Sequence, residues 1–236
     1  MSAATNLAVV QALRQQLDTR FPTARPLAQP KHGVVASGID LLDELLPGGL
    51  PRGAMSVVVG EPSSGKSALA ARWVAAVTQA GRTAAWVGAP LPSAAGLARQ
   101  GVDLKCLLAV RGAGDGGRKA AEALLESGVF DLLILDDDGK GNASSTAWPR
   151  LQRAAAGSRQ ALLVIADPPP LGDPLRYYAA VVLNARRERG AGIRLELLKS
   201  RFGKSGSGLR LDSMPDQAGF PILPELPGLL QAARDL

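Results

Sequence analysis

The chain has 236 residues, of which 46% are hydrophobic and 20% charged, so it can bury one core without a disulfide or a structural metal. Its net charge of +6 and pI of about 9.9 are compatible with a nucleic acid or an acidic partner, but an aromatic content of 4% argues against a base-stacking platform. No apolar run is long enough to span a bilayer and the N-terminus lacks the apolar region of a signal peptide, so we expect a cytoplasmic protein without membrane contact.

The first 32 residues are predicted to form an amphipathic helix followed by an extended linker. Residues 6–20 carry an apolar face at helical spacing, made of Leu7, Val10, Leu13 and Leu17. Prolines recur through residues 21–32 and prevent a helix there, which leaves His32 as a solvated linker residue. The helix could pack on its own domain or dock on a second subunit, giving a homo-oligomer. Both alternatives stay open.

Residues 60–67 read GEPSSGKS and fit the phosphate-binding loop pattern G-x-x-x-x-G-K-[ST]. A buried-strand pattern, 55–59, comes directly before this loop, and an Ala- and Leu-rich helix, 68–79, follows it. Strand, loop and helix in this order are the context that the pattern requires, although a glycine turn can fit it by chance. We therefore predict a nucleotide site made of Gly60, Glu61, Pro62, Ser63, Ser64, Gly65, Lys66 and Ser67.

Each type of residue in the loop suits a phosphate. Gly60 and Gly65 let backbone N–H groups come close to phosphate oxygens, and the N-terminus of the following helix adds a positive dipole. Lys66 is expected to reach the β- and γ-phosphates, and the Ser67 hydroxyl to ligate Mg²⁺. The expected cofactors are thus ATP and Mg²⁺.

The rest of the core alternates strands and helices, so we predict an α/β fold with a mostly parallel sheet covered on both faces. A short helix, 37–46, capped by Ser37 or Gly38, precedes the loop. Further apolar strands are predicted at 83–87, 107–110, 132–135 and 161–166, with helices at 115–127 and 144–156, the last possibly interrupted by Pro149. Cys106, beside the second of these strands, is expected to be a buried thiol.

The C-terminal part changes to strands in series, at 179–183, 193–198 and 209–211, which typically add an antiparallel edge to such a sheet. Residues 33–212 then form the core. Residues 213–236 form a tail that contains four prolines.

Three consecutive aspartates follow the apolar strand 132–135. The first, Asp136, closes the strand where a P-loop protein holds Mg²⁺, opposite Ser67; the alternative is an ordinary acidic loop. Asp137 is the candidate for a base that activates water, and both Asp137 and Asp138 could equally be solvated.

The run SGIDLLDELLPGGLPRGAMSVVVGEPSSGKSAL, 37–69, resembles the start of the RecA-type recombinase core, with Glu61 and Pro62 in swapped order. In that family a glutamate after the second strand activates water and a glutamine after a later strand senses the γ-phosphate. The matching positions here hold Pro90 and Asp167. The resemblance therefore implies ATP binding with weak or no hydrolysis, so it leaves open whether the protein is an enzyme.

The run Lys199-Ser200-Arg201-Phe202-Gly203 is similar to the Lys-Asn-Arg-Phe-Gly motif of RadA-type proteins. The resemblance implies that Lys199 and Arg201 contact the nucleotide held by the next subunit. The alternative is a generic basic face that binds DNA weakly, since the segment 186–210 contains Arg186, Arg187, Arg189, Arg194, Lys199, Arg201, Lys204 and Arg210.

A short RecA-like core with a helix-linker N-terminus, no catalytic glutamate and a proline-rich tail resembles the ImuA family, RecA-like accessory proteins of the bacterial mutasome. This resemblance implies an adaptor in damage-induced translesion synthesis, part of the SOS response, with ImuB, the polymerase DnaE2 and RecA as partners. The main alternative is a DNA-dependent ATPase of the RadA type that remodels DNA strands. A third, a division inhibitor acting by protein contact alone, has no specific support in the residues.

Overall fold

A computed structural model describes residues 30–139, 147–168, 174–188, 192–202 and 206–211. The predicted N-terminal helix, nearly all of the linker and the tail lie outside these residues, as do Arg189 and Lys204 of the basic segment. None of the helices among the described residues is long and apolar enough to cross a membrane.

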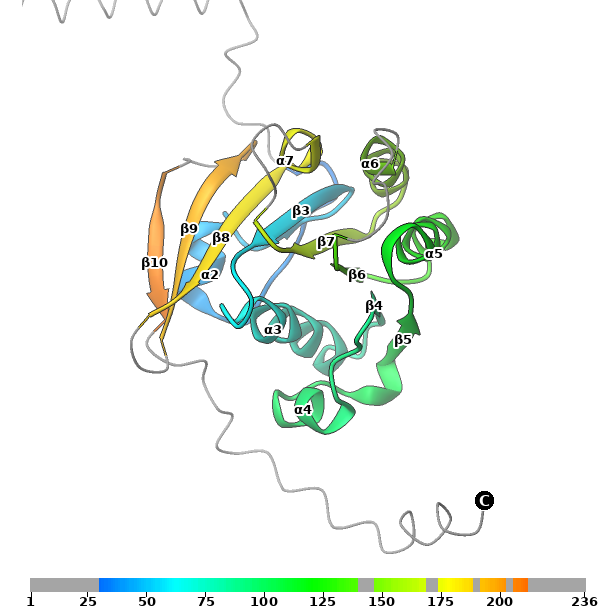
Figure 1. The fold of residues 1–236 in the computed structure, drawn as a ribbon, viewed down its shortest axis with the longest axis horizontal. Helices are drawn as coiled ribbons and strands as arrows, with labels where there is room; N and C mark the ends of the chain where they lie inside the picture. Colours follow the sequence, from blue (N-terminus) through cyan, green and yellow to red (C-terminus); the bar gives the residue numbers. More distant parts are fainter. Residues whose placement is uncertain (1–29, 140–146, 169–173, 189–191, 203–205, 212–236) are drawn as a thin grey trace, which may run out of the picture.

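One eight-stranded sheet forms the centre of the molecule (Figure 1). The strand order is β10-β9-β8-β3-β7-β6-β4-β5, and the six strands from β8 to β5 run parallel, whereas β9 and β10 are antiparallel. The strands are β3 (Ala54–Val59), β4 (Ala84–Gly88), β5 (Leu107–Arg111), β6 (Leu132–Asp137), β7 (Ala161–Ala166), β8 (Val181–Arg187), β9 (Ile193–Ser200) and β10 (Gly208–Leu211). This confirms the predicted α/β class with an antiparallel C-terminal edge.

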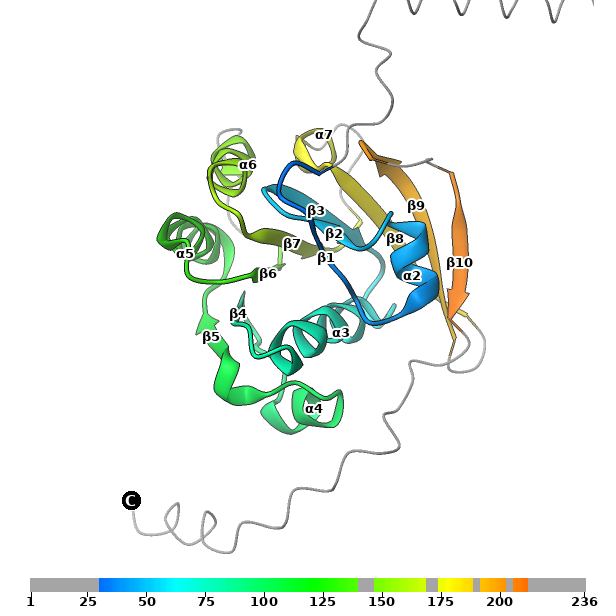
Figure 2. The ribbon, with the colours of Figure 1, turned by 180° about the vertical axis from the view of Figure 1, so that it is seen from behind.

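Helices cover both faces of the sheet. One face carries α2 (Asp40–Leu45), α3 (Lys66–Gln79) and, further out, α4 (Ala94–Arg99), as the reverse view shows (Figure 2). The other carries α5 (Gly114–Ser127), α6 (Ala147–Gly157) and α7 (Pro174–Tyr178). A two-stranded sheet, β1 (Val34–Val35) with β2 (Leu50–Pro51), and the 3₁₀ helix η1 (Leu104–Cys106) complete the described elements.

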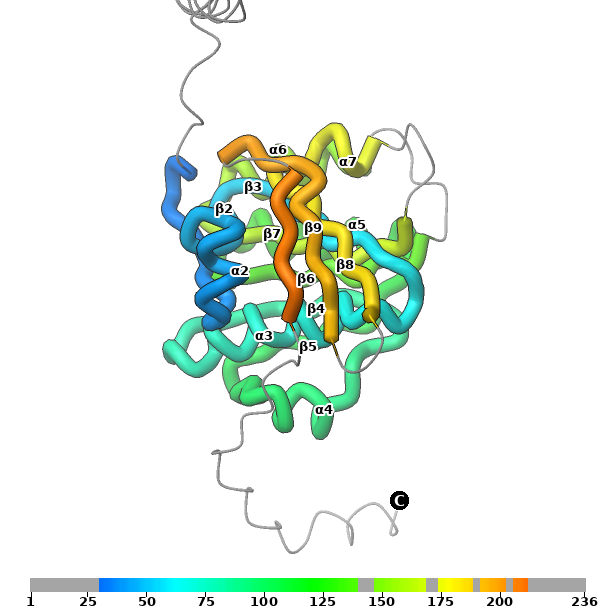
Figure 3. The backbone as a smooth tube through the Cα atoms, turned by 90° about the vertical axis from the view of Figure 1, so that its left-hand side faces the viewer, coloured from blue at the N-terminus to red at the C-terminus, as the bar shows by residue number. Residues whose placement is uncertain are grey.

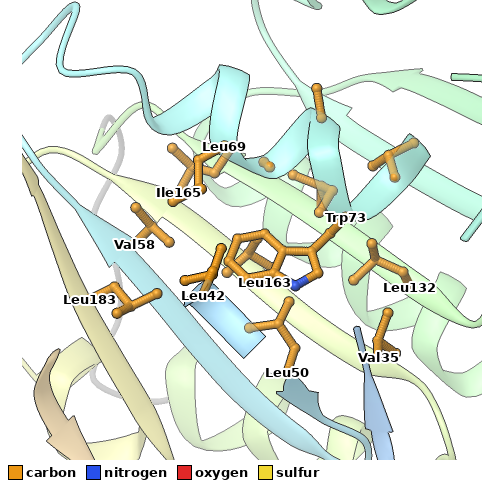
Figure 4. Close-up of a cluster of buried hydrophobic side chains, with 14 of the residues drawn as sticks. Val35, Leu42, Leu50, Val58, Leu69, Trp73, Leu132, Leu163, Ile165 and Leu183 are labelled. Carbon is orange, nitrogen blue, oxygen red and sulfur yellow. The ribbon is translucent and has the colours of Figure 1, made fainter. Parts of the chain in front are cut away.

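The two faces of each central strand enter two separate cores, because side chains alternate along a strand. Val58 and Ile134 point into the core under α3, while Val57 and Leu135 point into the core under α5 and α6. Trp73 of α3 is fully buried in the first core and lies among side chains from α2, β2 and β7 (Figure 4). Strands that are buried on both faces explain why the sequence shows continuous apolar runs there.

Several local predictions were wrong. Pro149 does not interrupt α6, because it occupies the first turn, where a missing N–H costs nothing. Ser37 is not the N-cap of α2, a position that Ile39 takes; instead the Ser37 N–H donates to the Asp43 carboxylate at 2.8 Å. Cys106 is partly exposed rather than buried. His32 is exposed, as predicted.

Candidate functional site

The phosphate-binding loop lies at the carboxyl ends of the parallel strands, between β3 in the middle of the sheet and the first turn of α3 (Figure 1). β7 lies between β3 and β6, so residues that follow β3, β7 and β6 meet at one edge. In the register of these strands, Ala166 is level with both Val59 and Asp137. Gly60, Asp167 and Asp138 therefore leave the sheet side by side.

The two loop glycines are needed for different physical reasons. Gly65 is the N-cap of α3 and has φ of 94°, a left-handed conformation that favours glycine, and no side chain caps the helix. At Gly60, a Cβ would overlap the Ala185 carbonyl oxygen, so only glycine fits between the loop and β8. The free N–H groups at the start of α3 therefore stay available for an anion.

Lys66 is buried and bound to its surroundings by three contacts. Its ammonium group donates to the Gly60 carbonyl, to the Glu61 carbonyl at 2.9 Å and to the Asp167 carboxylate at 3.1 Å. An ammonium has three donors, so all of them are used. Asp167 was predicted only as the residue that replaces a glutamine, and its pairing with Lys66 was missed.

Two clefts border the loop. The first, of about 290 Å³, we call the acidic cleft; it is lined by Lys66, Ser67, Ala89, Pro90, Leu91, Pro92, Asp136, Asp137, Asp138, Ala166 and Asp167. The second, of about 310 Å³, we call the basic mouth; it is lined by Ser63, Ser64, Gly65, Lys66, Ser67, Ala68 and Arg187. Residues 63–67 of the predicted loop and Asp136 thus line these clefts together with Arg187 of the basic segment, whereas Gly60, Glu61 and Pro62 line neither of the two.

Asp136 projects from β6 toward the face of α3 and shares the acidic cleft with Ser67. Burial raises the pKa of Asp136 to about 6, an effect that Lys66 opposes and that Asp137, Asp167 and Asp138 reinforce. Gly88 at the end of β4 lies close by, since a Cβ there would be 2.8 Å from that of Asp136. Pro90 follows in the same wall and offers neither a carboxylate nor an N–H.

Asp137 takes the opposite face of β6. Its carboxylate is buried and pairs with the buried guanidinium of Arg118 on α5 at 2.9 Å. Arg118 also pairs with Asp115 at 3.0 Å and stacks on the Trp148 ring, 5.2 Å from its centre. Burial raises the pKa of Asp137, and the Arg118 guanidinium opposes that rise. Asp137 also lines the acidic cleft, but its carboxylate is engaged by Arg118, which weakens the prediction that it activates water.

The donor set fits Mg²⁺ only in combination with phosphate. Ser67 and Asp136 provide one hydroxyl and one carboxylate in the same cleft, and the described residues contain no group of three or more His, Cys, Asp or Glu able to hold a metal. Mg²⁺ typically takes one or two carboxylates and completes its shell with substrate phosphates and water. Ser67 and Asp136 would hold the ion, which would neutralise phosphate charge.

Lys199 and Arg201 lie far from this edge. Lys199 is level with Val182 and, through it, with Val57, while the backbone N–H of Arg201 donates to the Ala180 carbonyl near the start of β3. Lys199 itself donates to the Arg176 and Tyr177 carbonyls at the end of α7, at 2.8 and 2.9 Å. Neither cation lines either cleft, so within one chain they do not reach the phosphate loop.

The basic segment is also divided. Figure 3 shows β8, β9 and β10 side by side, and the seven residues from Arg194 on β9 to Arg201, just beyond the end of this strand, span about 23 Å. Arg194 and Arg210 both pair with Glu188, at 2.5 and 3.2 Å, near the end of β8 that lies beside the phosphate loop. The described cations therefore form two groups at opposite ends of the strands rather than one patch.

A glycine loop between a central strand and a helix, with a carboxylate on the next strand but one, defines a P-loop nucleotide-binding core of the RecA/RadA type. The chain belongs to the family described as MT3502 N-terminal domain, whose model matches residues 44–170.

The chain is also similar in sequence to curated RecA proteins. The chain is 36% identical to the protein RecA of Picosynechococcus sp. over 115 residues, which cover 46% of this chain and 32% of that RecA. It is 32% identical to the protein RecA of Synechocystis sp. over 193 residues, which cover 65% of this chain and 53% of that RecA. The chain thus spans between about a third and half of the length of these relatives.

A solved structure of the RadB recombinase has the same fold. It superposes with a TM-score of 0.63 at 18% identity and covers 75% of this chain and 94% of that chain. At this identity the likeness concerns the fold alone.

Proposed function

We propose that the protein is a RecA-like accessory factor of damage-induced translesion DNA synthesis, which binds a Mg²⁺–nucleotide at its phosphate loop and hydrolyses ATP poorly. On this proposal it acts as an adaptor of the ImuA kind, with ImuB, DnaE2 and RecA as partners. One observation carries it. The phosphate loop and Asp136 have the residues that a Mg²⁺–nucleotide needs, yet the position where the resemblance implies a catalytic glutamate holds Pro90. The alternative carboxylate, Asp137, pairs with Arg118.

Nucleotide binding without efficient turnover is the biochemical core of this proposal. It is tested by measuring ADP and ATP affinity together with ATP turnover, with and without single-stranded DNA, for the wild type and Lys66→Ala. We expect Lys66-dependent binding and a turnover well below about 1 s⁻¹, the lower end for ordinary enzymes. Rapid turnover that single-stranded DNA stimulates and Lys66→Ala abolishes would instead support the RadA-type ATPase, which the intact Gly65, Lys66, Ser67 and Asp136 favour.

The adaptor role is tested in cells. Deletion of the chain should bring damage-induced mutagenesis down to the uninduced level, and the full chain should restore it. Purified ImuB and RecA should each bind the full chain, and a chain that binds neither would contradict the adaptor role. If residues 1–30 form the docking segment, their deletion should remove partner binding or self-association while leaving nucleotide binding intact.

Lys199 and Arg201 support a second element of the proposal, a cation pair directed at the nucleotide of a neighbouring copy. They lie at the edge opposite the phosphate loop of their own chain, so a nucleotide that they contact would have to be held by a second copy. Arg201→Ala should then abolish nucleotide-dependent self-association. The exposed Arg186→Ala, at the loop end of β8, is the control and should not change it.

A further inference from the structure

The phosphate loop separates two environments of opposite charge. In the acidic cleft, Lys66 is the only cation among the described lining residues, against the carboxylates of Asp136, Asp138 and Asp167 and that of Asp137, which pairs with Arg118. In the basic mouth, Arg187 and the N-terminus of α3 lie together with no carboxylate among the described lining residues. The electrostatic environment of a bound anion would therefore be unfavourable in the acidic cleft and favourable in the basic mouth.

The chemistry of such loops assigns the phosphates to these sides. The backbone N–H groups of a P-loop hold the α- and β-phosphates, and its lysine reaches the β- and γ-phosphates. The first two phosphates therefore belong beside Ser64, Gly65 and the basic mouth, and a third extends past Lys66 into the acidic cleft.

The acidic cleft offers little to a third phosphate. Asp167 already takes one of the three donors of Lys66, and its side chain, which is 69% exposed, lines the cleft. The opposite wall, Ala89 to Pro92, contains no side-chain donor, and two of its four residues lack a backbone N–H. A Mg²⁺ ion can offset the charge of Asp136, but Asp167 then still confronts the terminal phosphate with a like charge, which is unfavourable.

We infer that the site selects a nucleoside diphosphate over the triphosphate, and that Asp167 is the residue that sets this selectivity. The inference rests on the proposed nucleotide binding. A diphosphate ends at Lys66 and avoids the carboxylates beyond it, whereas a triphosphate must either displace Asp167 from Lys66 or lie against it.

The test is calorimetric titration of the full chain with ADP and with a slowly hydrolysed ATP analogue in the presence of Mg²⁺. We expect the wild type to bind ADP at least about tenfold more tightly than the triphosphate. Asp167→Asn keeps the size of the side chain and removes its charge, so it should strengthen triphosphate binding about tenfold and ADP binding less than about threefold. Thermal unfolding of the variant confirms that the fold is retained.

Asp138→Asn is the matched comparison, because it removes a charge from the same cleft at a residue that accepts from the Gly114 N–H, whereas Asp167 accepts from Lys66. It should change the ratio of the two affinities less than Asp167→Asn does. A wild type that prefers the triphosphate, or an Asp167→Asn variant with an unchanged ratio, would overturn the inference and leave nucleotide binding intact. An Asp167→Asn variant that loses ATP turnover while its affinities for ADP and the ATP analogue stay unchanged would also overturn the inference, since Asp167 would then be the base that activates water. If neither nucleotide binds in a Lys66-dependent way, the proposed function itself fails and the inference fails with it.

Discussion

Asp136 and Asp137 are consecutive residues of β6, and they lie on opposite faces of the sheet in contrasting surroundings. Asp136 opens into the acidic cleft beside Lys66 and has a pKa of about 6. Asp137 is buried on the α5 side of the sheet, where its carboxylate pairs with Arg118, whose guanidinium in turn stacks on Trp148. The difference shows that burial alone does not mark a functional carboxylate, because both are desolvated and both line the acidic cleft, but Arg118 already balances the charge of Asp137.

The largest effect on stability is expected on the face of the sheet that α5, α6 and α7 cover. Arg118→Met removes the cation that balances Asp137 and leaves a buried carboxylate without it, so we expect the free energy of unfolding to fall by about 3 to 5 kcal/mol. Urea denaturation measures this loss. Arg150→Met breaks the exposed pair with Glu122, 2.6 Å apart, and should cost less than about 1 kcal/mol.

A double variant separates charge balance from packing on that face. Arg118→Met with Asp137→Leu removes both charges together, and it should recover most of the stability lost by Arg118→Met alone. A single variant that loses less than about 1 kcal/mol would show that Asp137 is not dependent on Arg118.

The next effect concerns the phosphate loop. Gly65→Ala places a Cβ against Ile193 at a residue with φ of 94°, so the loop must shift, and we expect ADP affinity to fall by about tenfold or more. Gly81→Ala is the matched control, because Gly81 also has a positive φ, of 69°, but nothing lies near its added Cβ. Both variants should lose about 1 to 2 kcal/mol of stability from backbone strain, and only Gly65→Ala should weaken nucleotide binding. Equal weakening in both would remove the special role of the loop.

A smaller effect is expected at Asp136. Its folded pKa, about 6, lies above the ordinary value of 3.8, so the folded state binds the proton more tightly and gains stability below about pH 4. This gain disappears as the pH rises through 6, because the charged carboxylate is partly desolvated. The full difference corresponds to about 3 kcal/mol, and solvent screening of this partly exposed group reduces it to about 1 kcal/mol.

Asp136→Asn should therefore be more stable than the wild type by about 1 kcal/mol at pH 8, with EDTA present and no nucleotide. The two proteins should converge near pH 4. Urea unfolding at both pH values measures this, and a stability difference that does not change with pH would contradict the assigned pKa.

The sheet and the loop were predictable because both depend on short-range pattern. Apolar runs predict the buried parallel strands, and the carboxyl ends of parallel strands must share an edge, which places Asp136 beside Ser67. The partners of the charged groups were not predictable from such patterns. Lys66 pairs with a residue 101 positions away and Asp137 with one 19 positions away, and only the folded topology brings each pair together.

A strand irregularity limited the prediction for Lys199 in the same way. Leu183 pairs with Leu197, but Val182 pairs with Lys199, so Leu198 is an extra residue at a β-bulge. The bulge turns Lys199 toward the carbonyls of α7, whereas simple alternation from Leu195 and Leu197 would direct it into the core under α3.

The smallest effect on stability is expected at Lys199, a second cation on the face of the sheet that α5, α6 and α7 cover. Its ammonium is half-buried and bound to two neutral carbonyls, and burial, followed by the charge of Arg201, lowers the pKa of Lys199. Lys199→Met retains the aliphatic stem and loses hydrogen bonds to groups that water can reach, so we expect a loss of about 1 kcal/mol in urea unfolding. A loss as large as that of Arg118→Met would mean that any buried cation on this face is structural. A small loss would instead show that the decisive feature of the Arg118 site is a buried charge of opposite sign, which Lys199 does not have.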